Sequence, residues 1–225
     1  MNRIPTVSAL ICVRDGDAHL AEAIESALSQ TEPPDEVIVV DDGSKDGSRE
    51  VARSYAPRVQ LIEQARLGVA AARNRLVTAS SADAVAFLDC DDIWEPRKLE
   101  LQLEAFARDE ELDFCFTHTQ EFATPADRER FVVRPAPLRG ALASSLCARR
   151  GAIERAEGFD VDVRIGEVLG WLLRARELSM RELTLPEVLV HRRVHPNNIT
   201  RRERDGLGDY ARVLKASIDR RRQAP

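Results

Sequence analysis

Three carboxylates stand within four positions of the run FLDCDD at residues 87–92. Asp89, Asp91 and Asp92 follow an apolar stretch, and carboxylate oxygens are the ligands that Mg²⁺ and Mn²⁺ prefer in proteins. The string alone is weak evidence, because about one Asp-x-Asp occurs by chance in a chain of this length. The same spacing recurs in two other places, Asp15/Asp17 and Asp160/Asp162. A polar cap for a following helix is the competing interpretation, so the surrounding elements have to decide.

Short apolar runs alternate with amphipathic segments in the first half of the chain, a pattern typical of βαβ units in a parallel sheet. Leu20, Ile24, Ala27 and Leu28 fall on one helical stripe, for example. We predict strands at 7–13, 37–40, 59–63 and 84–89, helices at 18–30, 68–79 and 96–108, and a short helix around Val51.

Acidic residues follow three of these predicted strands. Asp15 comes after the first, Asp41 and Asp42 end the second, and the FLDCDD carboxylates end the fourth. Ligands bind beyond the carboxyl ends of the strands in open sheets of this kind. Carboxylates gathered on one rim repel one another, so we expect a divalent cation or a ligand rich in hydrogen-bond donors there.

The pattern loosens after residue 110. A helix at 167–179 and a final strand at 185–195 are clear from their apolar positions. We predict a strand pair, or a strand and a loop, at 112–122, a proline-punctuated connection at 124–140, and a packed helix or turn at 140–160.

Composition excludes some classes of function. The 225 residues carry 33 Lys and Arg against 38 Asp and Glu, a net charge of −5 that gives no basic surface for nucleic acid. The basic runs RRER and DRRRQ near the C-terminus are an exception, and fit either a solvated helix face or a patch for an acidic partner or membrane surface. Four widely spaced cysteines suit free thiols in a reducing compartment. With no signal peptide or transmembrane run, we expect a cytoplasmic protein, with any membrane contact peripheral.

Four ordered blocks, AEAIESALSQ, EVIVVDDGSKDGS, GVAAARN and FLDCDDIWEPRKL, make residues 6–105 resemble the N-terminal half of family 2 glycosyltransferases with a GT-A fold. The resemblance continues more loosely through GFD, GEVLGWLLRA and HRRVHPNNIT. It implies an α/β fold with a Rossmann-like, mostly parallel sheet flanked by helices. The expected organisation is a single domain over 1–225, with a nucleotide-sugar-binding half (1–110), an acceptor and catalytic half (111–205) and a C-terminal helix or tail (206–225).

For this family, the resemblance implies transfer of a sugar from a nucleotide sugar, with a UDP-sugar as the default, usually with inversion at the anomeric carbon. Mn²⁺ or Mg²⁺ would neutralise the diphosphate leaving group. Asp91 matches the family's metal ligand and Asp89 a ribose or metal ligand, while His195 is a candidate third ligand. The acceptor, which the resemblance leaves open, is a saccharide, a lipid, a peptide or a small molecule.

Residues of the VDDGS and ARN blocks match family positions that recognise the nucleoside. Asp41 and Asp42 are candidates for base or ribose contact, Arg73 and Asn74 for base contact, and Gly68 allows close backbone approach. The alternatives are a capped turn for the VDDGS block and a helix-surface charge for Arg73. The first strand departs from the family, because Arg14 and Asp15 follow Cys12 and Val13 where a Pro-x-Tyr-Asn segment is common; Arg14 is a candidate to stack on the base in place of the tyrosine.

The general base is the second departure. Aligned on WLLRA, Val168 stands where the family's catalytic Asp is expected, and Gly170 where a second acid often lies. Glu167 is the candidate replacement, with Asp160 or Asp162 as alternatives; Trp171 either lines an acceptor pocket or packs on the sheet. Loss of a base slows such a reaction by about 10²- to 10⁴-fold. The rival prediction is therefore a nucleotide-sugar-binding or partner protein that kept the donor site and lost the base.

Overall fold

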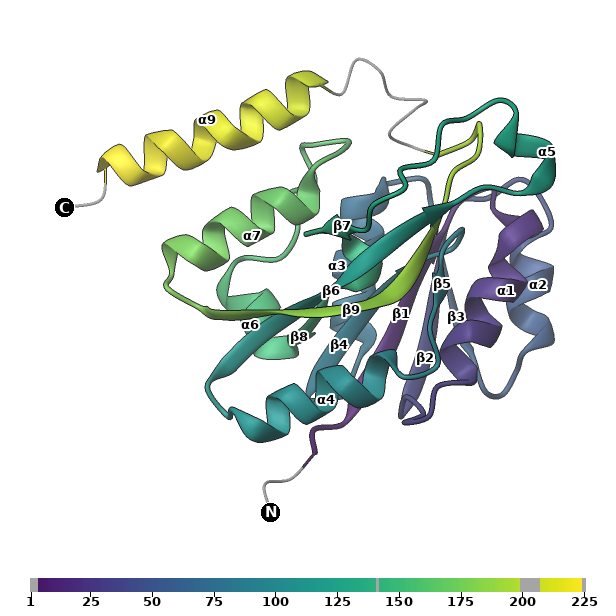
Figure 1. Ribbon diagram of the computed structural model, residues 1–225, viewed down its shortest axis with the longest axis horizontal. Coiled ribbons are helices and arrows are strands. Elements are labelled where there is room, and N and C mark those ends of the chain that lie inside the picture. The colour runs from purple at the N-terminus through teal and green to yellow at the C-terminus, as the bar shows by residue number, and fades with distance from the viewer. Residues whose placement is uncertain (1–3, 141, 199–206, 224–225) are drawn as a thin grey trace.

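The computed structural model describes residues 4–140, 142–198 and 207–223. One sheet of nine strands runs through this part of the chain (Figure 1). The strands are β1 (Val7–Val13), β2 (Glu36–Asp42), β3 (Gln60–Gln64), β4 (Ala84–Asp89), β5 (Ile93–Trp94), β6 (Leu112–Phe122), β7 (Leu138–Arg139), β8 (Cys147–Arg149) and β9 (Arg181–Arg193).

Helices occupy most of the remaining described residues. They are α1 (Asp17–Leu28), α2 (Ser48–Ser54), α3 (Val69–Ala79), α4 (Lys98–Arg108), α5 (Pro125–Arg128), α6 (Arg150–Arg155), α7 (Glu167–Glu177) and α9 (Leu207–Gln223), with a 3-10 turn η1 (Ala143–Ser145). The strands and helices predicted for the first half are confirmed, with bounds that differ by only a few residues.

The sheet has the order β3-β2-β1-β4-β8-β6-β9-β5, and β7 pairs with β6. β1 to β4 are mutually parallel, and β6 pairs with β9 in parallel, whereas β8 is antiparallel to both β4 and β6. The parallel half explains why the carboxyl ends of β1, β2 and β4 meet on one edge. The α/β architecture with a mostly parallel sheet is confirmed.

Two apolar layers cover the two faces of the sheet. Val7, Ile11 and their alternate neighbours on β1 pack with α1, α2 and α4, while Leu10 packs with α3, α6 and α7 on the other face. Burial on both faces accounts for the continuous apolar character of β1, β2 and β4. The outer helix α9 packs against α7, beyond the second layer (Figure 1).

The second half holds two corrections. The segment 112–122 is one continuous strand, β6, rather than a strand pair or a strand and loop. The segment 140–160 contains a strand, β8, in addition to helix and turn. A strand of three residues is too short to show a period of two, and its place in the sheet comes from pairing with β4 and β6, which are distant in sequence.

The four cysteines are free, as expected. Burial raises the pKa of the Cys12 thiol to about 12 and that of Cys147 to about 11, and it also raises the pKa of Cys90 and Cys115. Among the described residues, no helix combines the length and the apolar character that crossing a membrane requires.

Candidate active site

A cavity of about 300 Å³ lies at the carboxyl ends of β1, β2 and β4, facing the first turn of α7. Many of the residues predicted from the sequence line it, as do several that sequence reasoning missed. The predicted residues among them are Arg14, Asp42, Arg73, Asp89, Asp91, Asp92, Glu167 and Val168.

Arg73 is the central charge of this cavity. Its guanidinium is only 4% exposed and donates to two carboxylates, through Nη2 to Asp89 Oδ1 at 2.5 Å and through Nη1 to Glu167 Oε1. Burial alone would lower the pKa of Arg73, but Asp89 and other nearby groups raise it. The guanidinium therefore stays charged and joins α3, the end of β4 and the start of α7.

Asp91 is held by the segment that follows β9. His195 Nε2 lies 2.8 Å from Asp91 Oδ2, and Asn198 Nδ2 donates to the same oxygen at 2.9 Å. Burial would raise the pKa of the Asp91 carboxyl, yet the contacts with His195 and Asn198 lower it below its usual range. The His19 and His195 rings pack in a T-shaped arrangement with their centroids 5.0 Å apart.

Asp92 has a different environment from its neighbours. Its Oδ2 accepts from Ser144 Oγ at 2.6 Å and its Oδ1 from the Arg193 N–H at 3.1 Å, so both oxygens are used by the protein. Burial, with Asp91 and Asp89 close by, raises the pKa of Asp92 well above its ordinary value. Asp92 thus ties the acidic turn to η1 and β9.

Asp42 caps the start of α3. Its Oδ1 accepts from Leu67 N at 2.7 Å and from the Gln64 amide at 2.8 Å, and its Oδ2 accepts from Gly68 N at 2.9 Å. Gly68 adopts φ +97°, a left-handed value that glycine tolerates without strain. The carboxylate is therefore neutralised by backbone donors at a helix N-terminus.

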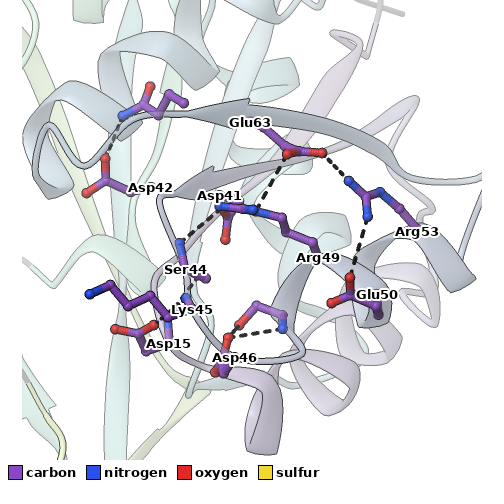
Figure 2. Close-up of polar contacts among 12 residues, drawn as sticks. Asp15, Asp41, Asp42, Ser44, Lys45, Asp46, Arg49, Glu50, Arg53 and Glu63 are labelled. Carbon is purple, nitrogen blue, oxygen red and sulfur yellow. Dashed lines mark hydrogen bonds and ion pairs between the residues drawn. The ribbon is translucent and has the colours of Figure 1, made fainter.

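Asp41 is completely buried and does not line the cavity. Its Oδ1 accepts from Ser44 N at 3.1 Å and Arg49 Nε at 2.8 Å (Figure 2). Within the described part of the chain, its Oδ2 has no hydrogen-bond partner. Asp15 is exposed and accepts from Lys45 N at 2.8 Å, which joins the β1 and β2 loops. The acidic clusters thus meet at one edge of the sheet, but most of their charge is balanced by local donors.

Some predicted residues lie outside the cavity lining, namely Asp15, Asp41, Gly68, Asn74, Trp171 and His195. The Asn74 amide donates to Phe159 O at 2.7 Å and accepts from Phe159 N at 2.8 Å, so it holds the 158–159 turn. Trp171 is fully buried among aromatic side chains, with its ring centroid 5.0 Å from that of Phe114. Trp171 therefore packs on the sheet and does not line a pocket.

Val168 and Gly170, where the family resemblance predicts acidic residues, differ in their surroundings. Val168 is 6% exposed and forms part of the cavity wall, beside Glu167. Gly170 faces α9, and a Cβ at this position would lie 3.6 Å from Val213 Cγ1. A carboxylate at residue 168 would reach the cavity, whereas one at residue 170 would meet α9.

The donor groups at this edge suit a hard divalent cation. Among the described residues, no three His, Cys, Asp or Glu side chains are grouped as a complete metal site. Asp91 with His195, and Asp89 nearby, offer the oxygen and imidazole donors that Mn²⁺ accepts, and such cations commonly take the rest of their ligands from substrate phosphates. The residues present therefore fit a cation bound together with a diphosphate.

Sequence reasoning missed several residues of the site. Asn198 stands in the same HPNNIT run as His195, so this run could have indicated Asn198 as a site residue. Ser144, Arg164 and Tyr210 have no motif of their own and reach the site only through the folding of the second half.

The sequence of the chain identifies the family to which it belongs. Residues 8–141 match the model of glycosyl transferase family 2, which is more than half of the chain, and the chain belongs to this family. The putative teichuronic acid biosynthesis glycosyltransferase TuaG of Bacillus subtilis is 35% identical over 141 residues, covering 60% of this chain and 55% of that protein. The first four curated relatives are matched over 32 to 55% of their own length.

Solved structures show the same GT-A fold. TarS of Staphylococcus aureus (residues 1–349, in complex with UDP) superposes with a TM-score of 0.72 at 16% identity, covering 95% of this chain and 65% of that one. The mannosyltransferase PcManGT of Pyrobaculum calidifontis, in complex with GDP-Man and Mn²⁺, gives a TM-score of 0.68 at 21% identity, covering 88% and 59%. At these identities the likeness concerns the fold.

Proposed function

We propose that this chain transfers a sugar from a nucleotide sugar to an acceptor, with a divalent cation on the diphosphate and inversion at the anomeric carbon. The observation that carries the proposal is the single cavity in which Asp42, Asp89, Asp91 and Glu167 meet at the carboxyl ends of the parallel strands. The family assignment supports it, as do the UDP and GDP-Man complexes of the two similar structures.

In the proposed reaction, an acceptor oxygen forms a bond to the anomeric carbon as the bond from that carbon to the diphosphate breaks. The proton of the acceptor passes to a base, and the nucleoside diphosphate leaves. A cation held by Asp91, His195 and Asp89 would neutralise the charge that develops on the diphosphate. Glu167 is the candidate base, acting through Oε2 because Oε1 accepts from Arg73.

Nucleotide binding with metal tests the donor site. We expect a melting-temperature increase with UDP or GDP in the presence of Mn²⁺, a much smaller one with EDTA, and none in Asp91→Asn. Asp162→Asn is the matched control, because Asp162 belongs to another Asp-x-Asp string and is exposed. If no nucleoside diphosphate shifts the wild-type transition with Mn²⁺, the donor-site assignment is wrong.

A second candidate function is a nucleotide-sugar-binding protein of low or no activity. Two observations favour it: Val168 occupies the cavity wall where an acid is expected, and Glu167 is committed to an ion pair with buried Arg73. Slow hydrolysis of a UDP-sugar that falls at least 10²-fold in Glu167→Gln would support the enzyme. Glu104→Gln on α4 controls for loss of an acid away from the cavity. Donor binding without any turnover, in a screen of UDP- and GDP-sugars, would support the binding protein.

A further inference from the structure

The outer face of α9 is unlike the rest of the surface. The helix contains five basic and two acidic residues, an excess of three positive charges in a chain with a net charge of −5. It also carries two large aliphatic side chains in solvent, Leu214 at 48% and Ile218 at 50% exposure. Positive charge and exposed apolar surface thus coincide on one element.

One side of α9 is buried against the rest of the protein. Asp209, Val213 and Ser217 are buried along it, and Ser217 Oγ donates to Glu177 Oε1 of α7 at 2.5 Å. Arg220 Nε donates to the other oxygen of Glu177 at 2.6 Å. These contacts fix α9 beside α7 (Figure 1) and leave the opposite face of α9 exposed.

A second line runs along the exposed side. With 3.6 residues per turn, Ala211, Leu214 and Ile218 form a stripe about 130° around the helix from the buried line. Arg221 lies on one side of this stripe, and Lys215 and Arg222 lie on the other. Arg221 Nε lies 3.8 Å from Glu177 Oε1, whereas Lys215 and Arg222 have no ion pair or hydrogen bond among the described residues. All three are exposed.

We infer that this face of α9, the stripe with its flanking cations, binds the surface of an anionic lipid bilayer. An apolar stripe with basic side chains on both sides of it suits the boundary between acyl chains and anionic headgroups. A protein partner would need a groove that fits the helix, whereas a bilayer needs only the stripe and the charge. Because the remainder of the chain has a net negative charge, the attraction to such a surface is concentrated at α9.

The same helix borders the cavity at its other end. Tyr210 lines the cavity, and Asp209 Oδ2 accepts from Arg164 N at 2.9 Å. Binding through α9 would therefore hold the cavity close to the membrane surface. Membrane binding through α9 does not depend on the reaction, so its failure would leave the proposed function unaffected.

Vesicle co-sedimentation of the whole chain tests the inference. We expect binding to vesicles of phosphatidylcholine with 30% phosphatidylglycerol, at least tenfold weaker binding to phosphatidylcholine alone, and a marked loss of binding in 0.5 M NaCl. Equal binding to both vesicles, or no binding to the anionic ones, would overturn the inference. These comparisons use wild-type protein and do not depend on any variant folding.

Two double variants assign the binding to the face. Leu214→Ser with Ile218→Ser, and separately Lys215→Gln with Arg222→Gln, are each expected to weaken binding at least tenfold while far-UV circular dichroism is unchanged. The controls are Val161→Ser with Leu178→Ser, which are exposed apolar residues elsewhere, and Arg53→Gln with Arg108→Gln. Control variants that weaken binding as much as the α9 variants would overturn the assignment. So would a wild-type dimer, seen by sedimentation velocity, that the α9 variants dissolve, because the face would then join two copies of the chain.

Discussion

Arg73 and Glu167 form a buried ion pair that joins α3 to the first turn of α7, and the same guanidinium contacts Asp89. The contact links the nucleotide-binding half to the half that holds the candidate base. Removing one member of a buried pair leaves a charge without compensation, which is strongly destabilising.

We therefore expect Arg73→Met to lower the free energy of unfolding by about 3 kcal/mol. Arg73→Met combined with Glu167→Gln is expected to cost less than the sum of the two single changes, because the second change removes the unpaired carboxylate. Urea denaturation of the four proteins measures this cycle. Additive effects within about 0.5 kcal/mol would show that the pair is not coupled.

Asn74 gives a prediction about which residues recognise the nucleotide. Its amide makes two hydrogen bonds to the Phe159 backbone, and a Cβ on Gly158 would lie 2.7 Å from Asn74 Oδ1. We expect Asn74→Ala to lower stability by about 2 kcal/mol, the cost of leaving buried backbone groups unpaired. The preference among UDP, GDP and ADP in thermal-shift titrations should stay the same. A changed preference at unchanged stability would restore Asn74 as a base contact.

Asp91 and Asp92 should respond differently to the same substitution. Asp92 uses both oxygens within the protein, so Asp92→Asn keeps an acceptor for Arg193 N and a polar partner for Ser144. We expect Asp92→Asn to retain Mn²⁺-dependent nucleotide binding within about tenfold in Kd, whereas Asp91→Asn should lose it. Titration calorimetry with UDP and Mn²⁺ makes the comparison. Equal losses would assign Asp92 to the metal.

The first half of the fold was predictable because its information is local. Val7 to Val13 is apolar throughout, as a strand buried on both faces must be, and the confirmed convergence of Asp42 and Asp89 follows from parallel strands ending on one edge. The hydrogen-bond partners of these acids could not be predicted from the sequence. Leu67 N and Gly68 N neutralise Asp42, and backbone donors leave no mark on residue type.

The second half depended on contacts between distant segments. β8 is a strand because β4 and β6 lie on either side of it, and Ser144 reaches Asp92 across 52 positions of sequence. The pairing of Arg73 with Glu167 spans 94 positions, and neither residue type indicates the other as its partner. Helical spacing alone allowed Trp171 to face either a pocket or the sheet, and the aromatic packing around Phe114 decided between them.

Val168 offers a test of the missing base by gain of function. It lines the cavity at 6% exposure, next to Glu167, so a carboxylate there would face the cavity. If the donor site is intact and Glu167 does not act as the base, Val168→Asp should raise UDP-sugar turnover by about 10²-fold or more, the usual contribution of a positioned base. Val168→Asn is the matched control for size and polarity. Equal turnover in the Asp and Asn variants would mean that the gain does not come from proton transfer.

Lys98 provides a prediction about stability and pH that is independent of the active site. Its side chain is fully buried, donates to Gln102 Oε1 at 2.7 Å and lies 4.0 Å from the centre of the Trp94 ring. Burial lowers the pKa of Lys98 from 10.5 to about 8. Between these two values the unfolded chain binds more protons than the folded chain, so this lysine makes the unfolding free energy rise with pH over that window.

The effect of Lys98 has to be measured as a difference in unfolding free energy between wild type and a Lys98 variant. The buried thiols, whose pKa values are raised, make stability fall with pH above about pH 9 in both proteins. Relative to Lys98→Met, wild-type protein should gain about 2 kcal/mol between pH 8 and pH 10, since each pKa unit corresponds to 1.36 kcal/mol. Urea denaturation at pH 7, 8, 9 and 10 gives the comparison. Lys45→Met removes an exposed lysine and should run parallel to wild type over this range. If Lys98→Met also runs parallel to wild type, Lys98 keeps its proton in the folded core and the lowered pKa is wrong.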